Sequence, residues 1–177
     1  MTTFFPEVKS WRLPVDVLNK AHAEFGFDGA AGNEGIMLWM GRRAEIVEVT
    51  HVVALRGPHI YKAPDLLVLA PELLNEVTDE AIRLGITLVG QIHSHPQNFL
   101  NLSPTDRDYG ISVPGFLSIV APHYGFIRPS KLSDYGVHTF EQGTGYRRMT
   151  TDEICHRISL TAAPAVDLLI VGDENHE

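Results

Sequence analysis

The stretch Gln91-Ile92-His93-Ser94-His95-Pro96 decides the fold, because it ends an apolar segment that predicts a central β-strand. Residues two apart on a strand point to the same face, so His93 and His95 should lie side by side. Their backbones would be roughly 6–7 Å apart. That separation lets two imidazoles converge on one ion at a Zn–N distance of about 2.0–2.1 Å. Pro96 ends the strand and leaves the pair where a ligand can reach it.

A helix start follows within eleven residues of the second histidine. In Ser103-Pro104-Thr105-Asp106, Ser103 can be the N-cap, Pro104 suits the first helical position and Asp106 comes three residues after the cap. This spacing aims the Asp106 carboxylate back toward the histidines. Two histidines and one carboxylate leave a tetrahedral zinc with one open position, which is typical of catalytic zinc. The sequence therefore predicts one Zn²⁺ per chain, held by His93, His95 and Asp106.

A plainer interpretation assigns these residues to a helix cap and a polar strand end. With nine histidines in 177 residues, an H-x-H pattern somewhere in the chain is about a coin toss. Requiring Ser and Asp at their two fixed positions lowers the chance of coincidence to roughly one in a thousand. The complete pattern therefore favours a metal site over the plainer interpretation.

The pattern H-S-H-x7-S-x2-D resembles the signature of the JAMM metalloproteases, also called MPN-plus or Mov34-type domains. The family also carries a glutamate upstream, as E-x-x-G-x-x-x-G. Here Glu34 and Gly41 match that pattern, and Met37 replaces the middle glycine. The resemblance implies that Glu34 is the general base and acid, and that Ser103 hydrogen-bonds the developing oxyanion. It also implies a cytidine-deaminase-like MPN/JAMM fold.

The same resemblance implies a substrate class. Family members cleave after the C-terminal glycine of ubiquitin or of ubiquitin-like proteins, by precursor processing or deconjugation. A chain this small resembles the prokaryotic branch, which accompanies E1-like and E2-like proteins in bacterial conjugation systems, some linked to antiphage defence. Two alternatives stay open: a peptidase that releases cysteine from a sulfur-carrier protein, and a metal-free MPN scaffold. Such scaffolds typically lack a ligand, whereas this sequence has all of them.

Composition excludes several other classes. The chain has 44% hydrophobic and 20% charged residues, and 14 basic against 22 acidic residues give a net charge of −8. Without a basic cluster we expect no nucleic-acid partner, and no apolar run is long enough for a membrane span. The lone Cys155 cannot form an internal disulfide, which favours the cytoplasm, and a buried thiol is expected. We expect one domain over residues 1–160, and a strand or tail over 161–177.

Apolar periodicity and turn residues predict an α/β fold with a curved mixed sheet flanked by helices. The predicted helices cover residues 15–25, 71–84 (ended by Gly85) and 151–158, and residues 27–33 are expected to form a loop. The predicted strands cover residues 35–40, 45–55, 86–92, 116–121, 125–127, 136–140, 146–149 and 167–171.

A few further side chains are candidates for roles near the metal. Asp108 is a candidate for orienting a ligand histidine, and Phe99 for lining a cleft. The other scattered histidines lack ligand spacing, so we interpret them as mostly surface or turn residues: His51, His59, His123 and His138.

Overall fold

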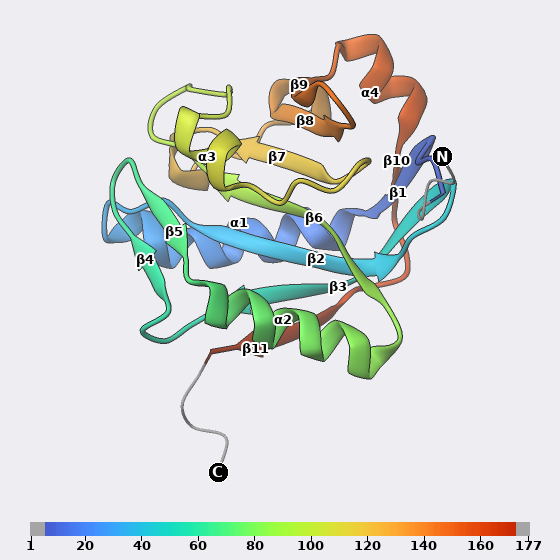
Figure 1. The fold of residues 1–177 in the computed structure, drawn as a ribbon. Coiled ribbons are helices and arrows are strands. Elements are labelled where there is room, and N and C mark those ends of the chain that lie inside the picture. Colours follow the sequence, from blue (N-terminus) through green and yellow to red (C-terminus); the bar gives the residue numbers. More distant parts are fainter. Residues whose placement is uncertain (1–5, 173–177) are drawn as a thin grey trace.

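The computed structural model describes residues 6–172 as one curled mixed sheet with helices on both faces (Figure 1). The main sheet contains β1 Ser10–Pro14, β2 Ile36–Arg42, β3 Ile46–Leu55, β6 Thr87–Ser94, β7 Leu117–Ala121, β8 Gly136–Glu141, β9 Gly145–Arg148, β10 Ile158–Thr161 and β11 Asp167–Val171. A separate hairpin pairs β4 Ile60–Lys62 with β5 Leu67–Leu69. The helices are α1 Val15–Ala30, α2 Pro71–Leu84, α3 Pro104–Tyr109 and α4 Thr151–Arg157, with 3₁₀ turns η1 His123–Gly125 and η2 Leu132–Asp134.

The strand that carries the histidines is central, as its apolar sequence predicts. The strand order is β10-β1-β3-β2-β6-β7-β8-β9, and β6 pairs antiparallel with β2 and parallel with β7. β11 pairs with the second half of β3, so the predicted strand over residues 167–171 joins the main sheet. The curved sheet flanked by helices is thus the predicted architecture.

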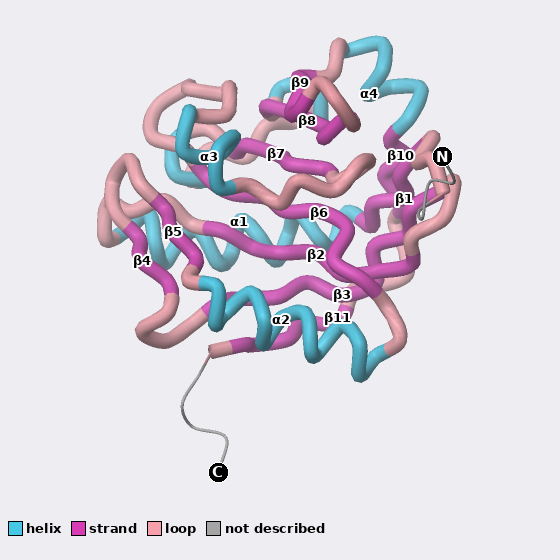
Figure 2. Tube along the Cα trace, in the orientation of Figure 1, coloured by secondary structure: helices cyan, strands magenta, loops and turns pink. Residues whose placement is uncertain are grey.

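Apolar clusters of side chains lie on both faces of this sheet. The helices α1 and α2 cover opposite faces (Figure 2). On one face α1 buries Val17, Leu18, Ala21 and Phe25. On the other face α2 buries Leu73, Val77 and Ala81 against apolar side chains of β2 and β3. Each fully buried aliphatic or aromatic side chain contributes about 1.5–3 kcal/mol, so both faces hold the sheet in place. Gly85 ends α2 with a φ of 67°, the left-handed conformation that favours glycine.

Several local predictions were wrong. α1 continues to Ala30, so the first part of the expected loop over residues 27–33 is helical. A Cβ on Gly29 would lie 2.9 Å from the ring of Phe126, so the glycine there serves close packing. The expected strand over residues 125–127 is instead the end of η1 and an irregular segment. Cys155 is exposed rather than buried.

The described residues contain no helix that is both long enough and apolar enough to cross a membrane.

Four strands were not predicted from the sequence: β1, β4, β5 and β10. They have only three to five residues each, which is too short for a clear period-two pattern.

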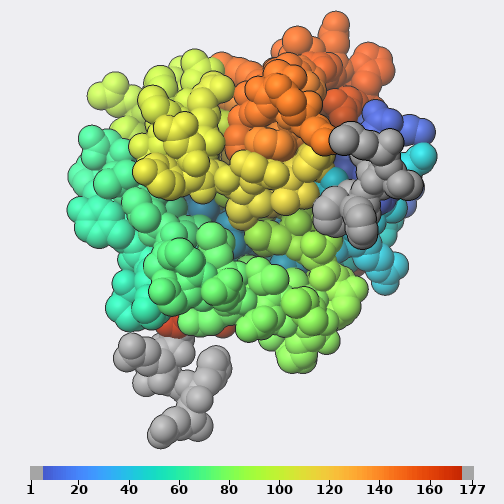
Figure 3. Space-filling view, viewed as in Figure 1, coloured from blue at the N-terminus to red at the C-terminus, as the bar shows by residue number. Residues whose placement is uncertain are grey.

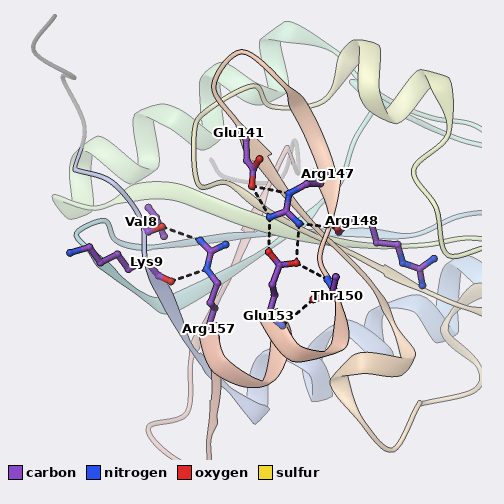
Figure 4. A network of polar contacts seen from close by, with 8 residues as sticks. All are labelled: Val8, Lys9, Glu141, Arg147, Arg148, Thr150, Glu153 and Arg157. Atoms are coloured by element: carbon purple, nitrogen blue, oxygen red, sulfur yellow. Dashed lines mark hydrogen bonds and ion pairs between the residues drawn. The ribbon is translucent and has the colours of Figure 1, made fainter.

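An ion-pair network joins the β8–β9 hairpin to α4 (Figure 4). The Arg147 guanidinium donates to one oxygen of Glu141 and to both oxygens of Glu153. Glu153 also completes a capping box with Thr150 at the start of α4. The network therefore ties the start of this helix to the sheet. At the other end of α4, Arg157 separately donates to the carbonyls of Val8 and Lys9.

Arg147→Met should lower the free energy of unfolding by about 1 kcal/mol at pH 7, a value limited by partial exposure of the network. The hydrogen bonds from Arg147 and Thr150 lower the pKa of Glu153 to about 2. A carboxyl group with a lowered pKa stabilises the folded state fully above its ordinary pKa of 4.5. This stabilisation is lost as the pH falls toward 2. Urea unfolding at pH 7 and pH 3 should show the deficit shrinking in acid. Arg148→Met is the matched control, and an equal loss there would contradict the role of the network.

Candidate metal centre

Three side chains from two elements converge at the end of β6. His93 lies in β6, His95 follows the strand directly, and Asp106 belongs to the first turn of α3. Their nearest atoms are His93 Nε2 to His95 Nε2 at 3.0 Å, His95 Nε2 to Asp106 Oδ2 at 3.2 Å and His93 Nε2 to Asp106 Oδ2 at 3.6 Å. The predicted triad is therefore brought together by the fold, and α3 lies beside the end of β6 (Figure 1).

These distances fit a divalent metal. Tetrahedral ligands at about 2.0–2.1 Å from a metal lie about 3.3 Å from one another, and the three observed separations bracket that value. Both histidines are buried, and two imidazole nitrogens and a carboxylate oxygen form a donor set that suits zinc. His93, His95 and Asp106 would hold the metal, which leaves a fourth tetrahedral position without a protein ligand.

The charges of the triad are mutually dependent. Burial raises the pKa of Asp106, but hydrogen bonds from His93 and His95 outweigh it and hold that pKa well below its ordinary value. Burial lowers the pKa of His93. It also acts to lower the pKa of His95, but Asp106 and Glu34 reverse that effect and raise it. The carboxylate is therefore ionised and His93 is neutral, as metal ligands must be, whereas His95 holds its proton more tightly and must release it when a metal binds.

Strand pairing places Glu34 opposite the histidines. Ile36 pairs with His93 in the antiparallel β2–β6 register, so the chain preceding β2 runs beside the chain leaving β6. Ser94 secures this contact, because its Oγ accepts from the Gly35 N–H at 2.9 Å and its own N–H donates to the Gly35 carbonyl at 2.9 Å. Ser94 therefore has the structural role that its place between the two ligands suggests.

Glu34 is itself buried, with 5% of its surface exposed. Its backbone N–H donates to the Ala63 carbonyl at 3.0 Å, which attaches it to the β4–β5 hairpin. Burial raises the pKa of Glu34 to about 7, opposed by His95 and assisted by Asp106 and Asp65. A carboxyl group with a pKa near neutrality can both accept and donate a proton.

Metal-free Glu34→Gln should be more stable than metal-free wild type by about 2–3 kcal/mol at pH 8, since it avoids ionising a buried carboxyl group. A raised carboxyl pKa destabilises the folded state fully above pH 7 and not at all below about 4.5. Thermal unfolding in chelator between pH 8 and pH 5 should therefore show the advantage disappearing in acid. An advantage independent of pH would contradict the raised pKa.

Ser103 and Asp106 form a capping box at the start of α3, as predicted. Ser103 Oγ accepts from the Asp106 N–H at 3.1 Å, and Asp106 Oδ2 accepts from the Ser103 N–H at 2.7 Å. Because Ser103 Oγ acts as an acceptor in the cap, its own hydroxyl proton is free to be donated elsewhere. Helix capping and donation to a ligand are therefore compatible for this residue.

Three residues with a left-handed backbone conformation lie in the segments that pack against each other beside His95. Gln97, His123 and Tyr124 have φ values of 52°, 54° and 54°, which are uncommon for residues with a side chain. The His123 N–H donates to the Gln97 carbonyl and the Tyr124 N–H to the His95 carbonyl. Such strained conformations persist where the surrounding structure fixes them, and they cluster at functional sites.

Of the other candidate residues within residues 6–172, Phe99 contacts the triad and Asp108 does not. Phe99 accepts a hydrogen bond from His95 Nδ1 at its carbonyl oxygen, 3.1 Å away, and its ring stacks on His95 at 5.4 Å between centroids. Asp108 is exposed, and no hydrogen bond between it and a ligand histidine is present among the described residues. His138 is fully buried, so interpreting it as a surface or turn histidine was wrong. No local pattern signals its burial, because its neighbours Val137 and Thr139 point to the opposite face of the strand.

No family model matches the chain. It is 32% identical over 161 residues to the probable metalloprotease y4jG of Sinorhizobium fredii (strain NBRC 101917 / NGR234), a match that covers 88% of this chain and 97% of that protein. The chain belongs to this metalloprotease family.

Two solved structures are similar to this chain, at lower sequence identity. The solution structure of DSY2949 from Desulfitobacterium hafniense has a TM-score of 0.62 at 18% identity, over 86% of this chain and 94% of that one, and it shares the fold. The crystal structure of AF2198, a JAB1/MPN domain protein from Archaeoglobus fulgidus, is more distant. Its TM-score is 0.43 at 14% identity, over 85% of this chain and 98% of that one.

Proposed function

We propose that the protein is a zinc-dependent, JAMM-type peptidase that cleaves after the C-terminal glycine of a ubiquitin-like protein. The observation that carries the proposal is the triad of nitrogen and oxygen donors 3.0–3.6 Å apart, with the buried Glu34 beside it. Catalytic zinc sites have three protein ligands and one open position, and this arrangement supplies that number. The proposed partners are the ubiquitin-like protein and its conjugates, with E1-like and E2-like proteins of a bacterial conjugation or antiphage system in the cytoplasm.

The chain's own residues supply the proton transfers. A bound zinc ion lowers the pKa of a coordinated water to about 7 and polarises a carbonyl as a Lewis acid. Glu34 takes a proton from the attacking water and returns it to the leaving amine, for which a pKa near 7 is well matched. The free hydroxyl proton of Ser103 is donated to the oxygen on which negative charge develops.

Exposed aromatic side chains near the centre support a protein substrate. Tyr109, the last residue of α3, is 84% exposed, and Phe99 is 49% exposed while stacked on His95. In the space-filling view, the segment with α3 lies on the surface between the β4–β5 hairpin and the β8–β9 region (Figure 3). Aromatic side chains are enriched at protein interfaces, so this surface suits a folded partner whose tail enters the site.

Cleavage of defined fusions tests the proposal. The zinc-loaded protein is incubated with a bacterial ubiquitin-like protein whose terminal Gly-Gly is extended by a short peptide, and intact mass identifies the new C-terminus. We expect cleavage directly after the last glycine, abolished by chelator and by changing Gly-Gly to Ala-Ala. A parallel fusion with a single C-terminal cysteine tests the sulfur-carrier alternative. Cleavage of that fusion alone, or of neither fusion, would contradict the proposal.

A further inference from the structure

His138 in β8 is buried, and its ring makes no hydrogen bond of ordinary geometry. It is 0% exposed, and among residues 6–172 the backbone of Ser118 interacts with the ring and acts to raise its pKa, without reaching hydrogen-bond geometry at Nδ1 or Nε2. Burial lowers the pKa of His138 to about 4, assisted by the charge of Arg148. The ring is therefore neutral and has one N–H donor and one acceptor nitrogen. Buried polar atoms in folded proteins are nearly all satisfied, either by protein or by ordered water.

The strand register places His138 in a polar row that leads toward the metal centre. Gln91 in β6 pairs with Ser118 in β7, and Ser118 pairs with His138. Directly opposite residues share a face of the sheet, and Gln91 Nε2 donates to Ser118 Oγ at 3.2 Å. His93 is two residues after Gln91 on the same strand, so it points to this face as well.

The two ligand histidines differ in how their second nitrogen is held. His95 Nδ1 lies 3.1 Å from the Phe99 carbonyl oxygen, which fixes its ring. His93 Nδ1 is buried and has no partner in the described part of the chain. A metal-binding histidine nearly always donates its other N–H to a carboxylate, a carbonyl or a water, which orients the ring. The Nδ1–H of a metal-binding His93 therefore needs an acceptor on this face of the sheet.

We propose that His138 is a positioning residue that orients His93 through ordered water in the polar row with Ser118 and Gln91. The water accepts the Nδ1–H of His93 and donates to the unprotonated nitrogen of His138. This water thereby partners His93 Nδ1 and the acceptor nitrogen of His138, while the N–H of His138 is left to the Ser118 backbone. The inference rests on the metal centre of the proposed function and is independent of the substrate.

Metal affinity without substrate tests this role. Zn²⁺ binding is measured by competition with a chromogenic chelator for His138→Leu, which removes both ring nitrogens, and for His138→Gln, which keeps a donor and an acceptor. We expect the leucine variant to bind about 10–100-fold more weakly, and the glutamine variant to recover most of the loss. The visible spectrum of the Co²⁺-loaded leucine variant should also change, since the orientation of a ligand ring changes.

Thr139→Val is the matched control. Thr139 is the next residue of the same strand, is buried, and has an unpartnered hydroxyl, but it points to the opposite face. We expect its Zn²⁺ affinity to equal that of the wild type. If His138→Leu does not fold, Ser118→Ala tests the same row, and weaker Zn²⁺ binding is expected.

Three results would overturn the inference: wild-type Zn²⁺ affinity in His138→Leu, equal weakening in the leucine and glutamine variants, or equal weakening in Thr139→Val. The last two would assign His138 to packing alone. Because these readouts need no peptide bond cleavage, a failed fusion assay would leave them unaffected.

Discussion

Glu34→Gln should lower peptide-bond cleavage by about 10²–10⁴-fold while the protein still binds one zinc ion per chain. Glutamine keeps the shape of the side chain but cannot exchange a proton near neutral pH. The triad lies on β6, the residue directly after it and α3, and it does not include Glu34, so the metal should be retained. Turnover of the Gly-Gly fusion and zinc content by elemental analysis measure the two quantities separately.

Glu72→Gln serves as the control for the change in charge. Glu72 is exposed in the first turn of α2, away from the triad in sequence and on a different element. We expect wild-type turnover and zinc content for this variant. If Glu34→Gln turns over at the wild-type rate with its zinc in place, another group must transfer the protons.

His95→Ala and Asp106→Ala should lose the metal and, with it, all measurable cleavage. Each removes one of three protein ligands from a site whose donor atoms lie 3.0–3.6 Å apart. The remaining two donors cannot complete a three-ligand catalytic site, so zinc should leave on dialysis. Zinc content after dialysis and circular dichroism of the same samples separate loss of metal from loss of fold.

Asp108→Ala is the matched control on the same helix. Asp108 is exposed two residues after Asp106, so its removal changes the charge without changing the ligand set. This variant should keep its zinc and its activity. Retention of a full zinc complement in both His95→Ala and Asp106→Ala would refute the triad as the metal site.

The triad could be predicted because its geometry is set by local sequence. The two histidines are spaced for one face of a strand, and the Ser103 cap fixes the first turn of α3, so each half of the site is encoded within a few residues. Pro71 and Gly85 bounded α2 correctly for the same reason, since each suits one end of a helix.

The features that escaped prediction depend on distant parts of the chain. β1 and β10 pair with each other although nearly 150 residues separate them, and neither segment has a pattern of its own long enough to identify a strand. Gly29, in the unpredicted last part of α1, packs so closely against Phe126 that a Cβ there would lie 2.9 Å from its ring, a contact between residues distant in sequence. The burial of His138 follows from the β7–β8 register, which no local pattern reveals.

The double use of one atom in α3 has a consequence for the order of this helix. Asp106 Oδ2 both accepts from the Ser103 N–H and faces the two histidine nitrogens. Metal binding and the local unfolding of residues 103–109 are therefore thermodynamically linked. A substitution that promotes unfolding of this short helix should also weaken metal binding, because the linkage is reciprocal. Amide hydrogen exchange in this segment should slow when the ion binds, which makes the backbone a reporter of loading.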